Sequence, residues 1–244
     1  MKNVKSNNWE GYKREHFGLS PKAKGLYDPQ FEHDSCGVGF VVNIKGKKSN
    51  EIVHQGLSIL LNLRHRGAVG AEPNTGDGAG ILFQIPHKFF HKVCKEEKIP
   101  LSAPGEYGVG MVLLPHDTKE RRDCEKIYEK IIKEEGQHFL GWRTVPTNNS
   151  NLGKTAKLSE PFVRQVFVGR DPKIKDELAF ERKLFVIRRR AYYTIRNSRM
   201  KGREYFYTTS LSHRTIIYKG MLLSEQVKEF YQDLSDPDIE TALA

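Results

Sequence analysis

Cys36 is the residue of this sequence whose type and surroundings best suit covalent chemistry. It stands before two glycines, Gly37 and Gly39, which keep bulky side chains away from the thiol. The segment before it begins polar and basic and shows little hydrophobic pattern. A cut between Ser35 and Cys36 would leave the α-amino group of Cys36, with a pKa of about 8, free to take the thiol proton. The sequence therefore predicts a nucleophilic cysteine behind a removable leader, residues 1–35.

The competing interpretation of Cys36 is a small buried apolar side chain, the usual role of a lone cysteine. The other two cysteines are Cys94 and Cys124, and the three lack the paired spacing of zinc sites or iron–sulfur clusters. An odd and sparse set also excludes a disulfide scaffold and favours a reducing compartment. We therefore expect no metal site in this chain and a cytoplasmic location.

Arg66 is the second candidate, because it stands where a predicted helix ends and a glycine-rich loop begins. A guanidinium fork suits a carboxylate or the dipole of a carbonyl oxygen, so Arg66 could bind a substrate beside the nucleophile. The alternative is an ordinary cation stabilised by the helix dipole.

The glycine-rich stretch Thr75-Gly76-Asp77-Gly78-Ala79-Gly80 resembles a phosphate cradle only at first sight. Its spacing is G-x-G-x-G, whereas a dinucleotide site needs G-x-G-x-x-G with a helix directly after it. Here a strand-like segment follows, residues 81–86. We expect these glycines to allow positive φ angles and a close approach to another element, with Asp77 bracing the loop.

Charge is concentrated in one segment of the 244-residue chain, whose net charge is +10. Nine Lys and Arg residues and no acidic residue lie from Arg182 to Arg203. Arginines seven apart share a helix face opposite an apolar stripe, the pattern of a solvated helix. That stripe is Phe180, Leu184, Ile187, Ala191 and Ile195. We therefore expect no nucleic-acid partner, and apolar runs of four or five residues exclude a membrane span.

Hydrophobic periodicity predicts the order of the elements. Strands are expected at 36–42, 81–86, 107–114, 142–145, 162–168, 204–210 and 214–218. Helices are expected at 51–63, after a cap at Asp117, from near Pro172, and at 224–234, with loops at 67–80 and 147–159. Strands that arrive in pairs between helices favour α+β layers over a doubly wound sheet.

Three separated motifs, in order, resemble the glutamate synthase family over most of the chain, from about Tyr27 to Leu234. The first is its processing site, Tyr27-Asp28-Pro29 with His33-Asp34-Ser35-Cys36-Gly37-Val38-Gly39-Phe40. The second is Asn62-Leu63-Arg64-His65-Arg66-Gly67-Ala68 leading into Glu72-Pro73-Asn74-Thr75-Gly76-Asp77-Gly78-Ala79-Gly80. The third is Leu211-Ser212-His213-Arg214-Thr215-Ile216-Ile217-Tyr218-Lys219-Gly220-Met221-Leu222.

This resemblance implies a class II glutamine amidotransferase domain, residues 36–244, of the N-terminal nucleophile type. The implied fold is a four-layer α-β-β-α sandwich, incomplete at the C-terminus. Cys36 would release ammonia from L-glutamine through a thioester, and Arg66 would lie beside it. Ammonia would then pass to a downstream synthase domain that uses FMN and an iron–sulfur cluster. The electron donor would be a small subunit or ferredoxin.

One departure from the family pattern affects activity. The arginine segment, the Asn-Gly pair and the aspartate that complete the family's glutamine site do not occur before Ala244, so the 244-residue chain is expected to be inactive alone. Two alternatives stay open: another class II amidotransferase, such as a purine or amino-sugar enzyme, and a non-catalytic binding module on the same fold.

Overall fold

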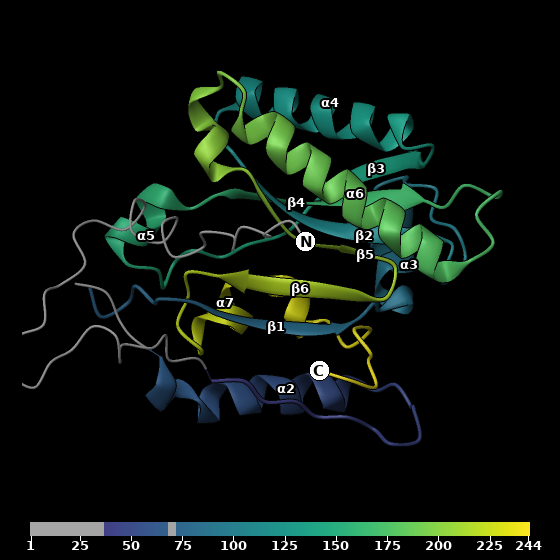
Figure 1. The fold of residues 1–244 in the computed structure, drawn as a ribbon. Coiled ribbons are helices and arrows are strands. Elements are labelled where there is room, and N and C mark those ends of the chain that lie inside the picture. Colours follow the sequence, from purple (N-terminus) through teal and green to yellow (C-terminus); the bar gives the residue numbers. More distant parts are fainter. Residues whose placement is uncertain (1–36, 68–71) are drawn as a thin grey trace, which may run out of the picture. The chain divides into compact units, whose positions relative to one another are not determined.

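A computed structural model of the chain describes residues 37–67 and 72–244. Cys36 and the predicted leader, residues 1–35, which ends at Ser35, lie outside the described residues. The described part from Gly37 to Ala244 forms one compact unit. Two antiparallel sheets form its centre, and helices cover their outer faces (Figure 1).

The larger sheet has four strands in the order β3-β4-β2-β5. They are β2 (Tyr107–Leu114), β3 (His138–Thr144), β4 (Phe162–Gly169) and β5 (Tyr207–Ser212). The register of β2 against β4 is unbroken from Tyr107–Gly169 to Leu114–Phe162. The central strands β2 and β4 are largely buried, which explains their near-continuous apolar sequences.

The smaller sheet pairs β1 (Ala79–Gln84) with β6 (Thr215–Gly220). The strands β5 and β6 are joined by the short turn around His213 and Arg214, so the chain passes directly from one sheet to the other. This turn keeps the two sheets packed face to face at this edge of the molecule (Figure 1).

Helices form the two outer layers. In Figure 1, α4 (Thr118–Glu134) and α6 (Glu177–Arg196) cover the four-stranded sheet, and α2 (Asn50–Asn62) covers the two-stranded sheet. The shorter helices are α3 (His87–Glu96), α5 (Lys154–Ser159) and α7 (Gln226–Phe230), with 3-10 turns η2 (Arg64–Arg66), η3 (Lys201–Tyr205) and η4 (Gln232–Ser235). The order helix, sheet, sheet, helix is the four-layer arrangement that the family resemblance implies.

The hydrophobic core has two parts, as this layering requires. One lies between the sheets and includes Phe83, Phe90, Phe167 and Tyr218. The other lies between the four-stranded sheet and helices α4 and α6. All five residues of the predicted inward stripe of α6, from Phe180 to Ile195, are fully buried in this second part.

Several predicted boundaries are wrong. Helix α6 begins at Glu177 rather than near Pro172, because the Asp176 carboxylate accepts hydrogen bonds from the backbone of Leu178 and Ala179 and so caps the helix. Helix α5 lies inside the predicted loop 147–159, and α3 follows Pro86 without having been predicted. The predicted helix 224–234 is the shorter α7 followed by η4.

The predicted strand at 36–42 is also wrong for its described residues. Residues 37–42 contain only an isolated bridge, from Val42 to Leu243. Ser49 forms a second bridge, with Thr241, so residues 241–244 do pair with the rest of the described fold.

Candidate functional site

The candidate site is an open hollow of about 330 Å³ that begins at Gly37, the residue bonded to Cys36. Four segments line it: residues 37–40, the inner side of α2 with Leu63, the start of β1, and residues 243–244. The α2 residues that line it are Gly56, Ile59 and Leu60, and those of β1 are residues 80–82. Its walls are therefore almost wholly backbone and apolar side chains.

Backbone hydrogen bonds hold the segment after Cys36 in place. The Val41 amide donates to the Ala244 carbonyl at 2.9 Å, and the Ala244 amide donates back at 3.0 Å. The Asn43 amide donates to the Ala242 carbonyl at 2.8 Å. Gly39 crosses α2 so closely that a Cβ there would collide with the Ile59 side chain. The lack of a side chain at Gly39 allows this close approach.

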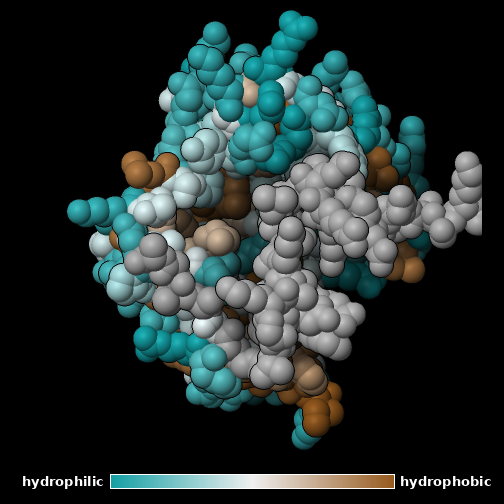
Figure 2. Space-filling model, turned by 60° about the vertical axis from the view of Figure 1, so that its left-hand side comes forward, coloured by the Kyte–Doolittle hydropathy of each residue, from teal (hydrophilic) through white to brown (hydrophobic). Residues whose placement is uncertain are grey.

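The side chains of this segment are unusually exposed for their apolar character. Val38 is 85% exposed, Phe40 75% and Ile44 96%. On the face drawn in Figure 2 the hydrophilic colour predominates, and hydrophobic residues form separate patches. The segment next to Cys36 therefore presents apolar surface beside the hollow rather than burying it.

Arg66 ends η2, which continues directly from α2. The turn closes with a hydrogen bond from the Gly67 amide to the Arg64 carbonyl at 3.0 Å. The side chain of Arg66 lies outside the described part of the structure, and so does Cys36. The described contacts therefore say nothing about the distance between the two predicted site residues, Cys36 and Arg66. The neighbouring His65 bonds the Asn62 carbonyl through Nδ1, which is a structural role.

The glycine-rich stretch allows the backbone to approach other elements closely, as predicted. A Cβ on Gly76 would lie 2.5 Å from the Leu223 amide nitrogen and closer still to the Leu222 carbonyl. Gly78 has a φ of +144°. Gly80 pairs with Lys219 of β6 so closely that a side chain on Gly80 would overlap Lys219. Asp77 Oδ1 lies 3.9 Å from the position of a Cβ on Gly67, so the stretch folds back toward η2.

The two described cysteines have no nucleophilic character. Cys94 and Cys124 are fully buried and free, in different parts of the core. Burial raises the pKa of each thiol to about 12. Since the thiolate is the reactive form, neither can act as a nucleophile near neutral pH.

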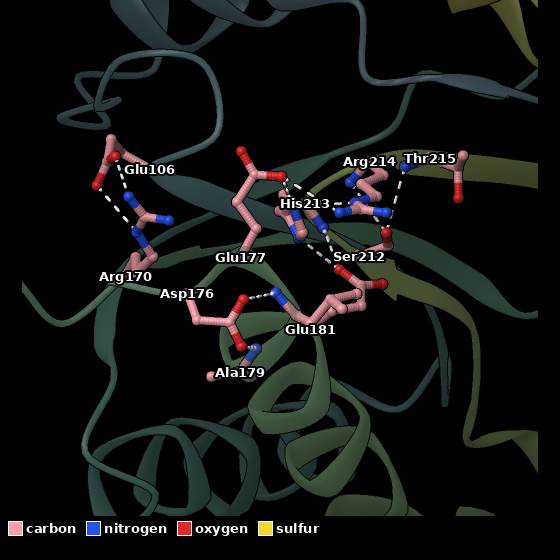
Figure 3. Close-up of polar contacts among 11 residues, drawn as sticks. Glu106, Arg170, Asp176, Glu177, Ala179, Glu181, Ser212, His213, Arg214 and Thr215 are labelled. Atoms are coloured by element: carbon pink, nitrogen blue, oxygen red, sulfur yellow. Dashed lines mark hydrogen bonds and ion pairs between the residues drawn. The ribbon is translucent and has the colours of Figure 1, made fainter. Parts of the chain in front are cut away.

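The third motif places a buried histidine at the turn between β5 and β6 (Figure 3). His213 donates from Nδ1 to the Glu181 carboxylate at 2.5 Å, while the Arg214 Nε donates to His213 Nε2 at 3.3 Å. Arg214 also reaches Glu177 at 3.2 Å. These contacts tie the turn to α6 and lie apart from the residues that line the hollow. Sequence reasoning gave this histidine no role, because its two glutamates come from a distant helix.

The basic segment is neutralised in part by ion pairs. Lys183 and Arg190 bind Glu135 of the α4 C-terminus, and Arg190 also binds Glu134 at 2.5 Å. Arg196 pairs with Glu204 at 2.9 Å and Arg182 with Asp176 at 3.4 Å. With Arg203, which also pairs with Glu204, five of the nine basic residues of this segment are paired with nearby carboxylates.

Neither a metal nor a membrane is suggested by the described residues. Within 37–67 and 72–244, no group of three or more His, Cys, Asp or Glu side chains could hold a metal ion. None of the helices in this part of the chain combines the length and apolarity needed to cross a bilayer.

Comparison with known proteins adds the identity of the family. Residues 36–244 match the model of the glutamine amidotransferases class-II. The chain is 50% identical over 228 residues to a glutamate synthase [NADPH] large chain of Bacillus subtilis, covering 93% of this chain and 15% of that protein. It is 41% identical over 220 residues to the corresponding large chain of Azospirillum brasilense, covering 89% and 14%. A ferredoxin-dependent glutamate synthase of Pyropia yezoensis is 39% identical over 223 residues, covering 91% and 14%. The chain thus spans about one seventh of the length of these relatives.

Proposed function

The chain belongs to the class II glutamine amidotransferases, and we propose that it hydrolyses the side-chain amide of glutamine for a glutamate synthase, with Cys36 as the nucleophile. The observation that carries the proposal is the family match, which begins at Cys36. Two structural facts support it. The candidate hollow starts at the residue bonded to Cys36, and the other two thiols are buried and unreactive.

The proposed reaction needs an N-terminal Cys36, and hence removal of residues 1–35. The free α-amine takes the thiol proton, and the thiolate attacks the amide carbon of glutamine. When the tetrahedral adduct collapses, the C–N bond breaks and the amine returns its proton to the departing nitrogen. Ammonia leaves and a glutamyl thioester remains. Water then attacks the thioester carbonyl. Glutamate is released, and the free thiol of Cys36 is regenerated.

Arg66 is proposed to bind the substrate near this thiol. Its backbone follows α2; Ile59 and Leu60 of α2, and Leu63 directly after it, line the hollow. A guanidinium can form two parallel hydrogen bonds to a carboxylate, which would orient glutamine as well as hold it. Orientation of this kind lowers the barrier to attack on the amide carbon.

The ammonia is proposed to serve a synthase domain of the same enzyme, since the relatives are named glutamate synthases and are about seven times longer than the match. These names favour a glutamate synthase over a purine or amino-sugar amidotransferase. The described residues do not fit the iron–sulfur cluster expected of that enzyme, because Cys94 and Cys124 lie in separate parts of the core. We propose that FMN and the cluster serve the synthase domain, and we assign no step of this chain to them.

Covalent labelling tests the nucleophile. The whole enzyme that contains this chain, with Cys36 at its N-terminus, is treated at pH 7 with a diazoketone analogue of glutamine, and the modified peptide is identified by mass spectrometry. We expect one label, at Cys36, with protection by glutamine and none by γ-aminobutyrate, which lacks both the α-carboxylate and the side-chain amide of glutamine. Labelling at a buried cysteine instead, or no protection by glutamine, would refute the assignment.

A second experiment addresses the whole enzyme that contains this chain. There, Cys36→Ala is expected to abolish glutamine-dependent glutamate synthesis, while synthesis from added ammonia continues. The enzyme purified without the substitution is expected to begin at Cys36. Equal loss of both activities would instead indicate that Cys36 supports folding.

A further inference from the structure

The outer face of α6 carries large apolar side chains and arginines in alternation. These side chains, here called the outer row, are Leu178, Arg182, Phe185, Arg189 and Tyr193. They follow one another at intervals of four, three, four and four residues, so they lie on one face of the helix. That face is opposite the inward stripe of α6, which is fully buried. Helix α6 therefore has an apolar component on both of its faces.

The apolar members of the outer row are exposed to solvent. Leu178 and Phe185 are each 54% exposed, and Tyr193 is 52% exposed. A single exposed apolar side chain is common on proteins, but these three lie in line, with Val186 exposed beside them. Helix α6 belongs to the outer layer opposite α2, which lines the candidate hollow (Figure 1). The outer row is therefore an apolar surface separate from the hollow.

Two neighbouring arginines of α6 contact aromatic rings instead of carboxylates. The guanidinium carbon of Arg189 lies 4.7 Å from the ring centroid of Tyr193, and Arg189 also donates to the Tyr193 hydroxyl. The guanidinium carbon of Arg188 lies 5.6 Å from the ring centroid of Phe185. Among the residues that the structure describes, no carboxylate pairs with either arginine. Their charges are therefore available to the carboxylates of a partner.

The third arginine of the outer row is held only weakly. Arg182 pairs with Asp176 at 3.4 Å, and the two side chains are largely exposed. An exposed ion pair of this length contributes little to stability, so a partner carboxylate can replace Asp176 at low cost. All the charged positions of the outer row can thus bind an acidic partner.

The aromatic surface continues from α6 onto β5 and β6. Tyr192, next to Tyr193, packs edge-on against Tyr207 of β5, with 6.5 Å between the ring centroids. Tyr207 is 43% exposed, and the Lys219 ammonium group of β6 lies 5.2 Å from its ring centroid. Aromatic side chains that neighbours already hold in place lose little freedom when a partner covers them, which favours binding.

The chemistry of this surface indicates the kind of partner. Protein interfaces are enriched in aromatic residues and arginine and depleted of lysine, and both charged positions of the outer row are arginine. Guanidinium groups bind carboxylates, and the apolar side chains between them need apolar contacts. A two-fold contact between two copies of this chain would place arginines close to arginines. A phosphate backbone would offer Leu178 and Val186 no apolar surface. The surface therefore fits a protein segment with Asp or Glu between apolar residues.

We propose that the outer row of α6, together with Tyr192 and Tyr207, is the docking surface for an acidic and apolar segment of the glutamate synthase outside these 244 residues. This rests on the proposed function, in which the chain serves a synthase domain of a longer enzyme. The relatives are about seven times longer than the match, so most of such an enzyme can provide this segment. A segment of the same polypeptide is present at a high effective concentration, so a surface of modest size suffices to bind it. Docking at α6 leaves the hollow, beside α2 in the opposite layer, open to glutamine.

Cross-linking in the whole enzyme tests for the partner carboxylate. Arg189→Lys keeps the positive charge and introduces a primary amine, which a carbodiimide joins to a carboxylate in contact with it. An amide bond forms between the amine nitrogen and the carboxyl carbon, and the displaced oxygen leaves in the urea product. Mass spectrometry should show position 189 joined to an Asp or Glu outside these 244 residues, in a product that the unsubstituted enzyme does not give. No cross-link, or one only to Asp176 or to a second copy of this chain, would overturn the proposal.

A matched pair of double variants tests whether the surface is covered. Phe185→Ser with Arg189→Glu removes one apolar and one charged member of the outer row, four residues apart on α6. Lys154→Glu with Leu158→Ser makes the same kind of change at two exposed residues, also four apart, on α5. The reporter is Tyr207, with which neither substituted pair has a ring contact, and hydroxyl-radical labelling of the whole enzyme measures its accessibility.

The α6 double variant is expected to raise the labelling of Tyr207 at least about fivefold, from the near-complete burial of an interface centre to the 43% exposure seen here. The α5 double variant should leave that labelling unchanged. Equal labelling of Tyr207 in both double variants and the unsubstituted enzyme would contradict the docking surface. If nuclease treatment made Tyr207 accessible in the unsubstituted enzyme, the occupant would be a nucleic acid and the proposal would be wrong.

The docking surface and the proposed function fail in different ways. Both double variants should keep the glutamine-protected labelling of Cys36, because neither changes a residue that lines the hollow. If the unsubstituted enzyme shows no such labelling, the proposed function fails. If Cys36 is labelled and protected but position 189 gives no cross-link outside these 244 residues, only the docking surface fails.

Discussion

Arg143 and Asp233 form a bidentate ion pair inside the protein, ninety positions apart in sequence. Each guanidinium nitrogen donates to one carboxylate oxygen at 2.8 Å, and the side chains are 7% and 2% exposed. The Tyr218 hydroxyl donates to the same carboxylate at 3.0 Å, and Gln165 joins both neighbours. Since these residues come from β3, η4, β6 and β4, the pair connects the two sheets.

The first prediction concerns this pair. Asp233→Ala should lower the free energy of unfolding by about 3–5 kcal/mol, because it leaves the Arg143 charge buried and unpaired. Denaturant unfolding followed by circular dichroism measures the change. The double variant Arg143→Met with Asp233→Ala should recover part of the loss, because no unpaired charge remains. A double variant less stable than Asp233→Ala would show that the pair acts through packing.

Gly76 gives a prediction about close backbone approach. Gly76→Ala should destabilise the fold by about 2–3 kcal/mol, because its Cβ would overlap the Leu222–Leu223 peptide, which cannot move as a flexible side chain can. Gly46→Ala is the matched control: Gly46 has a φ of +70° and open space around it, so only backbone strain of about 1 kcal/mol is expected. Equal losses in the two variants would contradict the overlap.

The glycine-rich stretch could be predicted from the sequence, whereas the buried ion pair could not. The apolar stripe of α6 was predicted residue by residue, because helical periodicity reports directly on a buried face. The glycine-rich stretch was also interpreted correctly, since the strand after it excluded a phosphate site. The Arg143–Asp233 pair could not be predicted, because tertiary packing alone brings its members together.

The errors have equally specific causes. The start of α6 was placed at Pro172, yet the Asp176 side chain provides the cap and overrides the preference of proline for a first turn. Helix α3 was missed although Phe89, Phe90, Val93 and Cys94 are spaced along one face. The outer row of α6 was not recognised as a docking surface, because only the structure shows that Arg188 and Arg189 contact aromatic rings.

Acid sensitivity is expected from His87. Burial, together with the charges of His91 and Lys48, lowers the pKa of His87 below its usual value of 6.5. The unfolded chain therefore binds a proton at this residue more readily than the folded chain does. Its contribution to stability is complete above pH 6.5 and is lost as the pH falls through the lower, folded-state pKa.

The measurement is the free energy of unfolding between pH 7.5 and about pH 5, across the usual titration range of histidine. His87→Gln should reduce the loss of stability on acidification relative to the unsubstituted chain, since glutamine does not titrate. An identical acid slope in His87→Gln and the unsubstituted protein would rule out this residue as its source.

The basic segment of α6 should bind DNA weakly and without sequence preference. Lys183 and Arg190 are held by Glu134 and Glu135 of α4, so a phosphate would have to displace these carboxylates before binding them. At about 150 mM salt, where screening is strong, the dissociation constant should be above the micromolar range. The double variant Glu134→Gln with Glu135→Gln frees both cations and should tighten binding at low salt. Submicromolar affinity of the unsubstituted chain at this salt concentration would contradict the prediction and favour a nucleic-acid role. If the double variant bound DNA no better than the unsubstituted chain, the ion pairs would not be what limits binding.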